Sequence, residues 1–359
     1  MTIAIDCRMI DASGIGVYLR GCLPWFLRSE NFFVLIGNSK ELSDFYSSKN
    51  TEIIDCKIKP FSLNELFFFP LKISKRINSA DVFYSPFFNI PGGIKTSVFT
   101  TIHDIIFPDM PELTSKIGLA IRMWFYRRAH KKSKKIFTVS QFSKSRIEHH
   151  LKKNKSSGLK PVIVTHSAIQ EKYLDYRREI KNIQKKEIII FIGNIKKHKG
   201  LDILLDAFIQ AKNEGLPHQL LIIGSKENFR SSDNIITKKI ESAGDEKIIF
   251  AGFVSEEALM EHLSSASLLV QPSLYEGFCL PPLEAMVLKT KALISDIPVL
   301  KEIYKDFPVT FFKAGEINDL KEKMTELLTC KPVDTVELSE HLMNKYTFKK
   351  TADIILNNL

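Results

Sequence analysis

Two glutamates eight positions apart, Glu276 and Glu284, stand in the stretch PSLYEGFCLPPLEAM, which runs from residue 272 to residue 286. Gly277 follows the first glutamate, and two prolines precede the second. Because proline suits the first turn of a helix, the pattern predicts that Glu276 lies in a loop and that Glu284 lies within a helix. One carboxylate can then face the reacting end of a ligand, while the other accepts hydrogen bonds from hydroxyls farther along that ligand.

The starts of two predicted helices have backbone amides that could bind an anion. Amides at a helix start lack partners within the helix, and the helix dipole favours negative charge there. Near the N-terminus the helix follows ASGIG, whose glycines let the backbone approach a ligand closely, with an ordinary tight turn as the alternative. The candidates in this loop are Gly14, Ile15 and Gly16. The candidates beside the two glutamates are Phe278, Cys279 and Leu280.

A lysine-rich loop, IGNIKKHKG from residue 192 to residue 200, joins another predicted strand to a helix. Lys196, Lys197 and Lys199 could add point charges to the amides of the helix start, as a bound diphosphate requires. The loop is not a Walker A loop, because the glycine spacing and the hydroxyl residue after the lysine are both missing. Ordinary surface lysines are the alternative interpretation.

Apolar runs that suit strands alternate with helical patterns in both halves of the chain. The first half contains TIAID, FFVLIG, SVFTTIHD and KIFTVS, and the second contains EIIIFIGN, HQLLIIGS, SLLVQPS and KALISDI. Such alternation is typical of parallel sheets covered by helices on both faces. We therefore predict an α/β fold with two Rossmann-like, doubly wound domains. Ligands of these sheets bind beyond the carboxyl ends of the strands, so we expect the site in a central cleft between the domains.

The polar stretch from Tyr173 to Lys186 has few apolar residues and is interpreted as a linker. It suggests a first domain over residues 1–170 and a second over residues 171–343. An amphipathic helix is expected in the remaining segment, residues 344–359. Within the first domain the opening helix is expected from Gly16 to Phe26, directly after the ASGIG loop.

Composition narrows the class of protein. The 359 residues are 44% hydrophobic and 26% charged, as in ordinary globular proteins. Asp6 and Arg8 interrupt the first apolar run, which argues against a signal peptide, and no run reaches the roughly 18 apolar residues of a membrane span. Five scattered cysteines indicate neither a disulfide framework nor a zinc site. We expect a cytoplasmic protein.

The net charge of +10 is concentrated in one segment. Between Arg122 and Lys160 there are thirteen Lys or Arg residues and one acid, Glu148, so the rest of the chain is about neutral. Such a segment could contact an anionic membrane, a phosphorylated lipid or nucleic acid, and a solvated helix face is the alternative. The part RMWFYRRAHKKSKK mixes aromatic and basic residues, as expected at lipid headgroups.

The stretch EGFCLPPLEA resembles the E-x7-E motif of family 4 retaining glycosyltransferases, which have the GT-B fold. Further similarity extends over most of the chain. It includes SGIGVYL, TTIHDIIFPDMPE, FTVSQFSKSRI, GNIKKHKGLDILLDAF, FAGFVSEEAL, SDIPVLKEI and YTFKKTADIIL. In that fold the N-terminal domain binds the acceptor, the C-terminal domain binds the nucleotide sugar, and the last helix crosses back to the N-terminal domain.

The resemblance implies a role for each matching residue. Glu284 would bind the ribose of the nucleotide, and Glu276 would contact the donor sugar near its reacting carbon. Lys199, with Lys196 or His198, would hold the diphosphate. Gly14 and Gly16 would lie under the diphosphate from the other domain, and His103 would reach the donor sugar. The backbone around Phe253 and Val254 would line the base.

Two departures from the family pattern bear on the site. The arginine usual in the phosphate loop is absent, which leaves Lys196, Lys197 and His198 as its candidate replacements. Cys279 stands where glycine is common, and its β-carbon would narrow the space beside the donor sugar.

The resemblance implies a retaining hexosyltransferase that needs no metal, in keeping with the missing D-x-D pair. We expect a hexose from GDP-mannose first, or from a UDP- or TDP-hexose second, to pass to a glycan acceptor. The basic segment suits an acceptor that is a lipid-linked oligosaccharide at the cytoplasmic face of the inner membrane. Such an acceptor would place the protein in cell-surface polysaccharide synthesis. The alternatives are a nucleic-acid-binding protein, which would leave both glutamates unused, and a GT-B epimerase or phosphorylase; we expect no nucleic acid partner.

Overall fold

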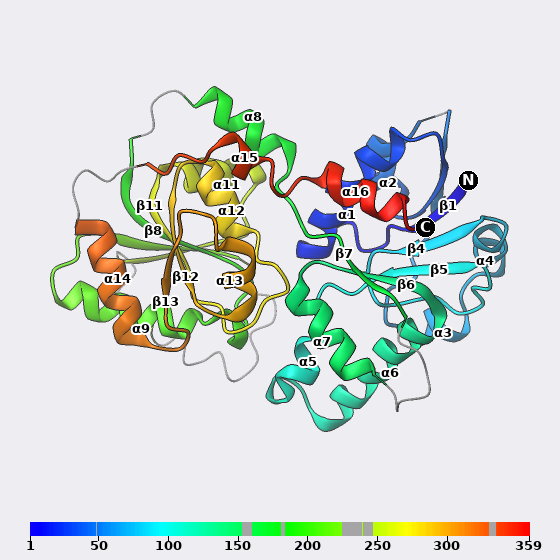
Figure 1. Cartoon of the computed structure of the whole chain (residues 1–359), viewed down its shortest axis with the longest axis horizontal. Coiled ribbons are helices and arrows are strands. Elements are labelled where there is room, and N and C mark those ends of the chain that lie inside the picture. Colours follow the sequence, from blue (N-terminus) through cyan, green and yellow to red (C-terminus); the bar gives the residue numbers. More distant parts are fainter. Residues whose placement is uncertain (48, 153–159, 181–183, 225–238, 240–246, 330–334) are drawn as a thin grey trace. The chain divides into compact units, whose positions relative to one another are not determined.

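The computed structural model describes the chain except residues 48, 153–159, 181–183, 225–238, 240–246 and 330–334. The described residues divide into two compact units. The first unit comprises Met1–Ala168 and Tyr346–Leu359, and the second comprises Ile169–Lys345. Each unit is built on one parallel sheet flanked by helices (Figure 1).

The sheet of the first unit has the order β3-β2-β1-β4-β5-β6-β7. Its strands are β1 (Thr2–Asp6), β2 (Phe32–Gly37), β3 (Thr51–Asp55), β4 (Val82–Ser85), β5 (Ser97–Thr101), β6 (Ser133–Thr138) and β7 (Val162–Val164). Its helices are α1 (Ser13–Leu27), α2 (Ser39–Leu42), α3 (Leu63–Phe67), α4 (Leu71–Asn78), α5 (Ile106–Asp109), α6 (Lys116–Lys132), α7 (Gln141–Leu151) and α16 (Phe348–Leu356).

The sheet of the second unit has the order β10-β9-β8-β11-β12-β13. Its strands are β8 (Lys186–Ile192), β9 (Gln219–Ile223), β10 (Ile248–Gly252), β11 (Ala266–Gln271), β12 (Lys291–Ser295) and β13 (Thr310–Phe312). Its described helices are α8 (Glu171–Glu179), α9 (Leu201–Asn213), α11 (Glu256–Ser265), α12 (Pro281–Val287), α13 (Pro298–Tyr304), α14 (Ile317–Thr329) and α15 (Glu340–Met343).

The central strands are apolar throughout because helices cover both faces of each sheet. In β8, for example, Ile189, Ile190 and Phe191 point to alternate faces, and all three are fully buried. On one face Ile189 and Phe191 pack in a core with Leu204 of α9 and Met324 of α14. The expected alternation of strands and helices is therefore present in both units, and each is a doubly wound α/β sheet.

Both sheets reverse their strand order beside the first strand of the unit. In the first unit β1 lies between β2 and β4, and in the second unit β8 lies between β9 and β11. Ligands of doubly wound sheets bind at such switch points, beyond the carboxyl ends of the strands. The loops that follow β1, β4, β8 and β11 are thus the positions at which functional side chains are expected.

The last helix, α16, packs on α1 of the first unit. Gly21 of α1 makes room for it, since a β-carbon there would lie 2.3 Å from the ring of Phe348. The hydroxyl of Thr351 donates to the carbonyl oxygen of Thr165 at 2.9 Å. Contacts of both kinds hold the terminal segment on the sheet of the first unit.

Two expectations about local structure were wrong. The stretch from Tyr173 to Lys186 is not a linker, because it contains most of α8 and Tyr173 is buried; residues 181–183 lie outside the described part of the chain. The opening helix begins at Ser13 rather than at Gly16, so the glycines belong to its first turn. The Glu, Lys, Leu and Arg residues of α8 favour a helix intrinsically, so the shortage of apolar residues did not by itself indicate a linker.

Candidate active site

Glu276 lies in the loop after β11, and its carboxylate is buried with 8% of the residue exposed. Its Oε1 atom accepts a hydrogen bond from Lys199 Nζ at 2.7 Å and another from Ser273 Oγ at 2.7 Å. Lys199 is 77 positions away in the loop after β8. The switch point between β8 and β11 thus brings together two residues that the sequence predicts to bind the same ligand.

Close backbone contacts hold these two loops together. Gly200, directly after Lys199, has φ +67°, a left-handed conformation that favours glycine. A β-carbon at Gly200 would lie 2.0 Å from the carbonyl oxygen of Pro272 in the loop after β11. The amide of Leu274 donates to the carbonyl oxygen of His198 at 2.7 Å. The position of Lys199 relative to Glu276 is therefore fixed by the backbone as well as by the ion pair.

The groups around Glu276 keep its carboxylate ionised. Burial alone would raise its pKa, but Lys199 and the hydrogen bonds from Lys199 and Ser273 hold that pKa below the usual range of a glutamate. The pKa of His198 is lowered to about 4, by burial first and by Lys199 second. His198 is thus neutral at pH 7, so the fixed positive charge beside Glu276 comes from Lys199.

Glu284 lies in α12, as the prolines indicated, and it titrates in the opposite sense to Glu276. Burial raises the pKa of Glu284 to about 7, with smaller effects from Lys172, Glu256 and Tyr173. Tyr173 comes from α8 and makes a side-chain hydrogen bond with Glu284 that lowers this pKa. Tyr173 was missed in the sequence because its stretch had been interpreted as a linker.

Cys279 has the backbone conformation of a glycine. Its φ is +72°, in the left-handed region. The carbonyl of Cys279 accepts a hydrogen bond from the hydroxyl of Tyr304 in α13, which holds the turn. Burial raises the pKa of the Cys279 thiol well above its ordinary value, so the thiol is neutral. The conformation accounts for the preference for glycine at this position.

The remaining candidates in this turn surround Cys279. Phe278 is buried, and Leu280 is the residue at the start of α12. Gly277 follows Glu276 directly. Their amides therefore belong to the loop between Glu276 and α12, at the carboxyl end of β11.

The other candidates of the second unit lie in separate loops. Lys196 and Lys197 are exposed and precede Lys199 in the loop after β8. Phe253 and Val254 follow β10, at the same edge of the sheet as Lys199. Phe253 is 82% exposed, and Val254 is half-buried. Base binding by these two residues stays a prediction.

In the first unit, Gly14, Ile15 and Gly16 form the first turn of α1, after β1. A β-carbon at Gly16 would lie 2.2 Å from the carbonyl oxygen of Ile10, whereas a β-carbon at Gly14 would have no atom within 4 Å. The two glycines therefore differ: Gly16 is required by the fold, whereas Gly14 leaves the helix start open.

His103 follows β5, at the same edge of the first sheet as Gly14. Its Nε2 atom lies 2.8 Å from the carbonyl oxygen of Pro86. Because a carbonyl can only accept, Nε2 carries the proton and Nδ1 has the free electron pair. Burial lowers the pKa of His103 to about 4, so the ring is neutral at pH 7. It packs edge-on against Tyr18 of α1, with 4.9 Å between ring centroids.

Among the described residues, no group of three or more His, Cys, Asp and Glu side chains is arranged to hold a metal ion. None of the helices described here is long and apolar enough to cross a membrane.

Comparison with solved structures shows the fold. HepE from Anabaena, in complex with UDP and glucose, superposes with a TM-score of 0.70 at 14% identity, over 100% of this chain and 99% of that one. Sucrose-phosphate synthase from Thermosynechococcus elongatus gives a TM-score of 0.73 at 15% identity, over 100% and 98% of the two chains. The protein therefore has the GT-B fold of two Rossmann-like domains.

Sequence comparison points to glycosyltransferases. Residues 174–347 match the model of the family described as glycosyl transferases group 1. The serotype-specific mannosyltransferase WbdA of Escherichia coli is 29% identical over 170 residues, 47% of this chain and 20% of that protein. The O-antigen chain mannosyltransferase B of Escherichia coli is 26% identical over 233 residues, 63% and 59% of the two chains. These alignments thus leave much of both relatives uncovered.

Proposed function

We propose that this protein is a retaining glycosyltransferase that moves a hexose from a nucleotide-diphosphate sugar to a hydroxyl of a glycan acceptor. The observation that carries the proposal is the Lys199–Glu276 ion pair at the switch point of the second unit, in which the carboxylate is buried and the lysine side chain is 22% exposed. The family match over residues 174–347 covers the loops of both residues, and the GT-B fold supports the same activity.

The proposed chemistry divides the two charges between the two fragments of the donor. As the bond between the anomeric carbon and the diphosphate breaks, the sugar becomes positive and the diphosphate gains negative charge. Glu276, held ionised, stabilises the sugar, while Lys199 and the amides at the start of α9 stabilise the diphosphate. Neither side chain has to move far, because the backbone contacts at Gly200 already fix both loops.

Retention follows from attack on the face that the diphosphate leaves. The acceptor oxygen bonds to the anomeric carbon on that face, and its proton passes to an oxygen of the departing phosphate. Glu284 takes no part in this step, since we assign it to the ribose hydroxyls. A glycosyl adduct trapped on Glu276 would contradict this route and favour a covalent intermediate.

We propose GDP-mannose as the donor and cell-surface polysaccharide synthesis as the setting. The support is that relatives over the aligned region are named as mannosyltransferases, including the O-antigen chain mannosyltransferase RfbU of Salmonella typhimurium, 27% identical over 207 residues. We propose a lipid-linked glycan at the cytoplasmic membrane face as the acceptor. No metal takes part in the proposed step.

Thermal unfolding in the presence of GDP, UDP, TDP or ADP, each with EDTA, tests the donor assignment. The proposal expects GDP to raise the melting temperature most and expects metal-free release of GDP from GDP-mannose. Stabilisation by UDP with hydrolysis of a UDP-hexose would replace the donor and keep the activity. If no nucleotide raises the melting temperature, the transferase proposal is wrong.

A further inference from the structure

The first unit carries large apolar side chains that point into solvent. Four lie on or beside α3 and α4, and three lie on α6. We call these seven residues the apolar surface: Leu63, Phe67, Phe68, Leu71, Ile117, Ile121 and Trp124. Each is between 48% and 76% exposed. Single exposed apolar residues are common, but a group of this size marks a site of interaction.

The two parts of the apolar surface adjoin each other. On α6 the three residues recur at intervals of four and three, so they form one stripe along the helix. Phe125, next to Trp124, packs against Phe61, which stands just before α3, with 5.6 Å between ring centroids. Phe61 also contacts Phe88 in the loop after β4. Phe61 thus connects the stripe on α6 to the residues of α3.

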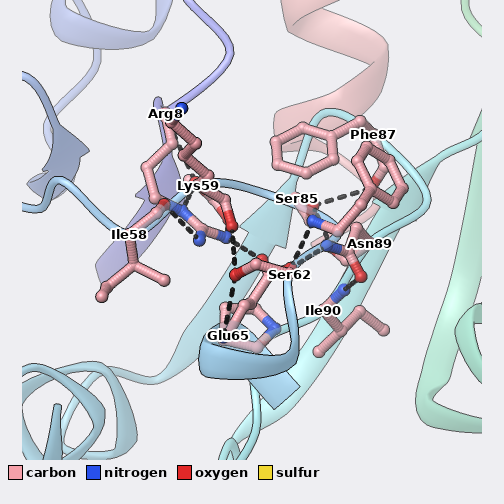
Figure 2. Close-up of polar contacts among 12 residues, drawn as sticks. Arg8, Ile58, Lys59, Ser62, Glu65, Ser85, Phe87, Asn89 and Ile90 are labelled. Atoms are coloured by element: carbon pink, nitrogen blue, oxygen red, sulfur yellow. Dashed lines mark hydrogen bonds and ion pairs between the residues drawn. The ribbon is translucent and has the colours of Figure 1, made fainter. Parts of the chain in front are cut away.

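A buried polar cluster around Glu65, shown in Figure 2, holds helix α3 on the unit. Its only buried residue is Glu65, which is fully buried. The carboxylate of Glu65 accepts hydrogen bonds from Arg8 and Asn89 and from the amide of Phe61, the last at 2.7 Å. Arg8 also pairs with Asp6.

This arrangement inverts the usual amphipathic helix, which buries its apolar side. Here a glutamate is the anchor, and Leu63 and Phe67 remain outside at 71% exposure each. The amide of Gly92 donates to the carbonyl oxygen of Glu65 at 2.8 Å and fixes the helix from the loop after β4. Burial within the unit therefore does not explain the apolar residues of α3, which indicates a partner outside the unit.

The charge around the apolar surface identifies the partner. Residues 57–78 contain five Lys or Arg, and residues 116–135 contain eight. The acid in these two ranges is Glu65, which is already paired with Arg8. Lys72 and Lys75 are exposed on α4, and Arg127 and Lys131 are exposed on α6. Two copies joined through this surface would bring like charges together, whereas an anionic bilayer offers both opposite charge and an apolar interior.

Some cations of the expected basic segment point elsewhere. Arg128 donates to the carbonyl oxygens of Ile90 and Pro91, and Lys135 Nζ donates to the carbonyl oxygen of Asn358 at 2.9 Å. These two residues hold the loop after β4 and the terminal segment of the first unit. The cations available beside the apolar surface are thus fewer than those of the segment from Arg122 to Lys160. They also include cations of α4, which the sequence pattern does not indicate.

We propose that the apolar surface docks the protein on an anionic lipid bilayer, with Phe67, Phe68 and Trp124 entering the headgroup region. The exposed cations of α4 and α6 beside it contact the lipid headgroups. Helix α3 follows β3 and the loop of Phe88 follows β4, so this surface adjoins the edge of the first sheet that also carries His103. Docking there presents the edge to an acceptor anchored in the same bilayer. Only this last step rests on the proposed glycosyl transfer.

Flotation with vesicles tests the docking. The full-length protein is mixed at low salt with vesicles of phosphatidylcholine alone or of phosphatidylcholine with phosphatidylglycerol. We expect retention by the second kind only, and release as salt rises. The double variants F67S/F68S and I121S/W124S are expected to lower the partition coefficient by about tenfold or more. Tyr46→Ser is the control, since Tyr46 is 60% exposed in the same unit outside the surface.

Charge is tested separately from insertion. In K72Q/K75Q we expect binding to fall by about fivefold for each lysine removed.

Trp124 is one of two tryptophans, so a W25F background makes its fluorescence a direct reporter. A blue shift on addition of the anionic vesicles is expected if Trp124 enters the headgroup region, and an unchanged spectrum would contradict its insertion.

Two results would overturn the proposal. One is a wild-type protein that stays in solution with every vesicle. The other is a dimer, seen by analytical ultracentrifugation, that F67S/F68S converts to monomer while vesicle binding is unchanged. Release of GDP from GDP-mannose without vesicles is measured in the same variants. If that activity persists while flotation is lost, docking and glycosyl transfer are separate properties, and failure of one leaves the other standing.

Discussion

The carboxyl edges of the two sheets have the same construction and different chemistry. In each unit the helix after the first strand, α1 or α9, begins beside a glycine that leaves no room for a β-carbon, Gly16 or Gly200. At the edge of the second sheet an ion pair joins the half-buried Lys199 to the buried Glu276. At the edge of the first sheet the corresponding candidate is His103, a neutral imidazole beside Tyr18.

This difference bears on which unit binds the donor and which unit binds the acceptor. A charged fragment such as a diphosphate is stabilised by fixed opposite charge in a buried site, which the second unit supplies. At the edge of the first sheet the buried charges of Arg8, Asp6 and Glu65 are already paired with one another. Exposed cations of this unit lie on α4 and α6, beside the apolar surface. This difference supports the proposal that the second unit binds the donor and that the first unit binds the acceptor and its membrane.

Replacement of Glu276 should have the largest effect. In Glu276→Gln the side chain keeps its size but loses the charge that faces the sugar, so we expect turnover to fall by ~10²-fold or more while the protein stays folded. Steady-state release of GDP from GDP-mannose measures the loss. The exposed Glu340→Gln serves as the control. Normal turnover in Glu276→Gln would remove Glu276 from the mechanism.

Substitution of Gly16 and Gly200 tests how strongly each sheet edge depends on a glycine for its stability. Gly16→Ala and Gly200→Ala should each lower the free energy of unfolding by about 1–3 kcal/mol, because the new methyl group meets a carbonyl oxygen. Gly200→Ala should cost more, since its φ of +67° is also strained for alanine. Chemical denaturation measures both changes.

Gly14→Ala is the matched control for the first edge, with open space around the new β-carbon. We expect it to leave stability unchanged and to weaken GDP-mannose binding. Equal loss of stability in the Gly14 and Gly16 variants would refute the distinction between them.

His103→Gln should lower turnover by about tenfold, a smaller loss than at Glu276 because His103 is uncharged.

The pH dependence of the free energy of unfolding tests the protonation state of His103. The unfolded chain gains a proton on His103 near pH 6.5, and the folded chain gains it only near its pKa of about 4. Wild-type stability therefore falls as pH decreases through this window, and the variant should lose less. Identical pH profiles of the two proteins would argue against a buried neutral His103.

Tyr173→Phe should have the smallest effect. It removes a hydrogen bond that lowers the pKa of Glu284, so that pKa should rise from its wild-type value of about 7. If the ribose hydroxyls donate to ionised Glu284, the pH at which GDP affinity increases moves upward, and affinity at pH 7 falls by less than about tenfold. Calorimetric titration of GDP across the pH range measures this. An unchanged midpoint would limit Tyr173 to packing.

Much of the fold could be predicted from the sequence because its signals are local. Buried strands such as β2 and β8 are continuous apolar runs between turns, and prolines mark the start of α12. The carboxylate of Glu276 and the ammonium of Lys199 could be named as candidates from their loops. Their direct contact could not, since 77 positions separate them and only the strand order brings them together.

The missed features are those in which a residue's environment reverses its usual role. Helix α8 buries Tyr173 against a glutamate of another helix, so its sequence lacks an apolar stripe. Helix α3 buries Glu65 and exposes Phe67, so a run that is typical of a core lies on the surface. Both reversals depend on partners distant in sequence, which local patterns do not contain.

Proton NMR of GDP-mannose incubated with the protein and EDTA, with water as the acceptor, tests the proposed transfer directly. We expect slow release of GDP and mannose, with the α anomer of mannose appearing first because configuration is retained. We also expect Glu276→Gln to give almost no release under the same conditions. Initial appearance of the β anomer, or equal rates in the two proteins, would contradict the role assigned to the Lys199–Glu276 pair.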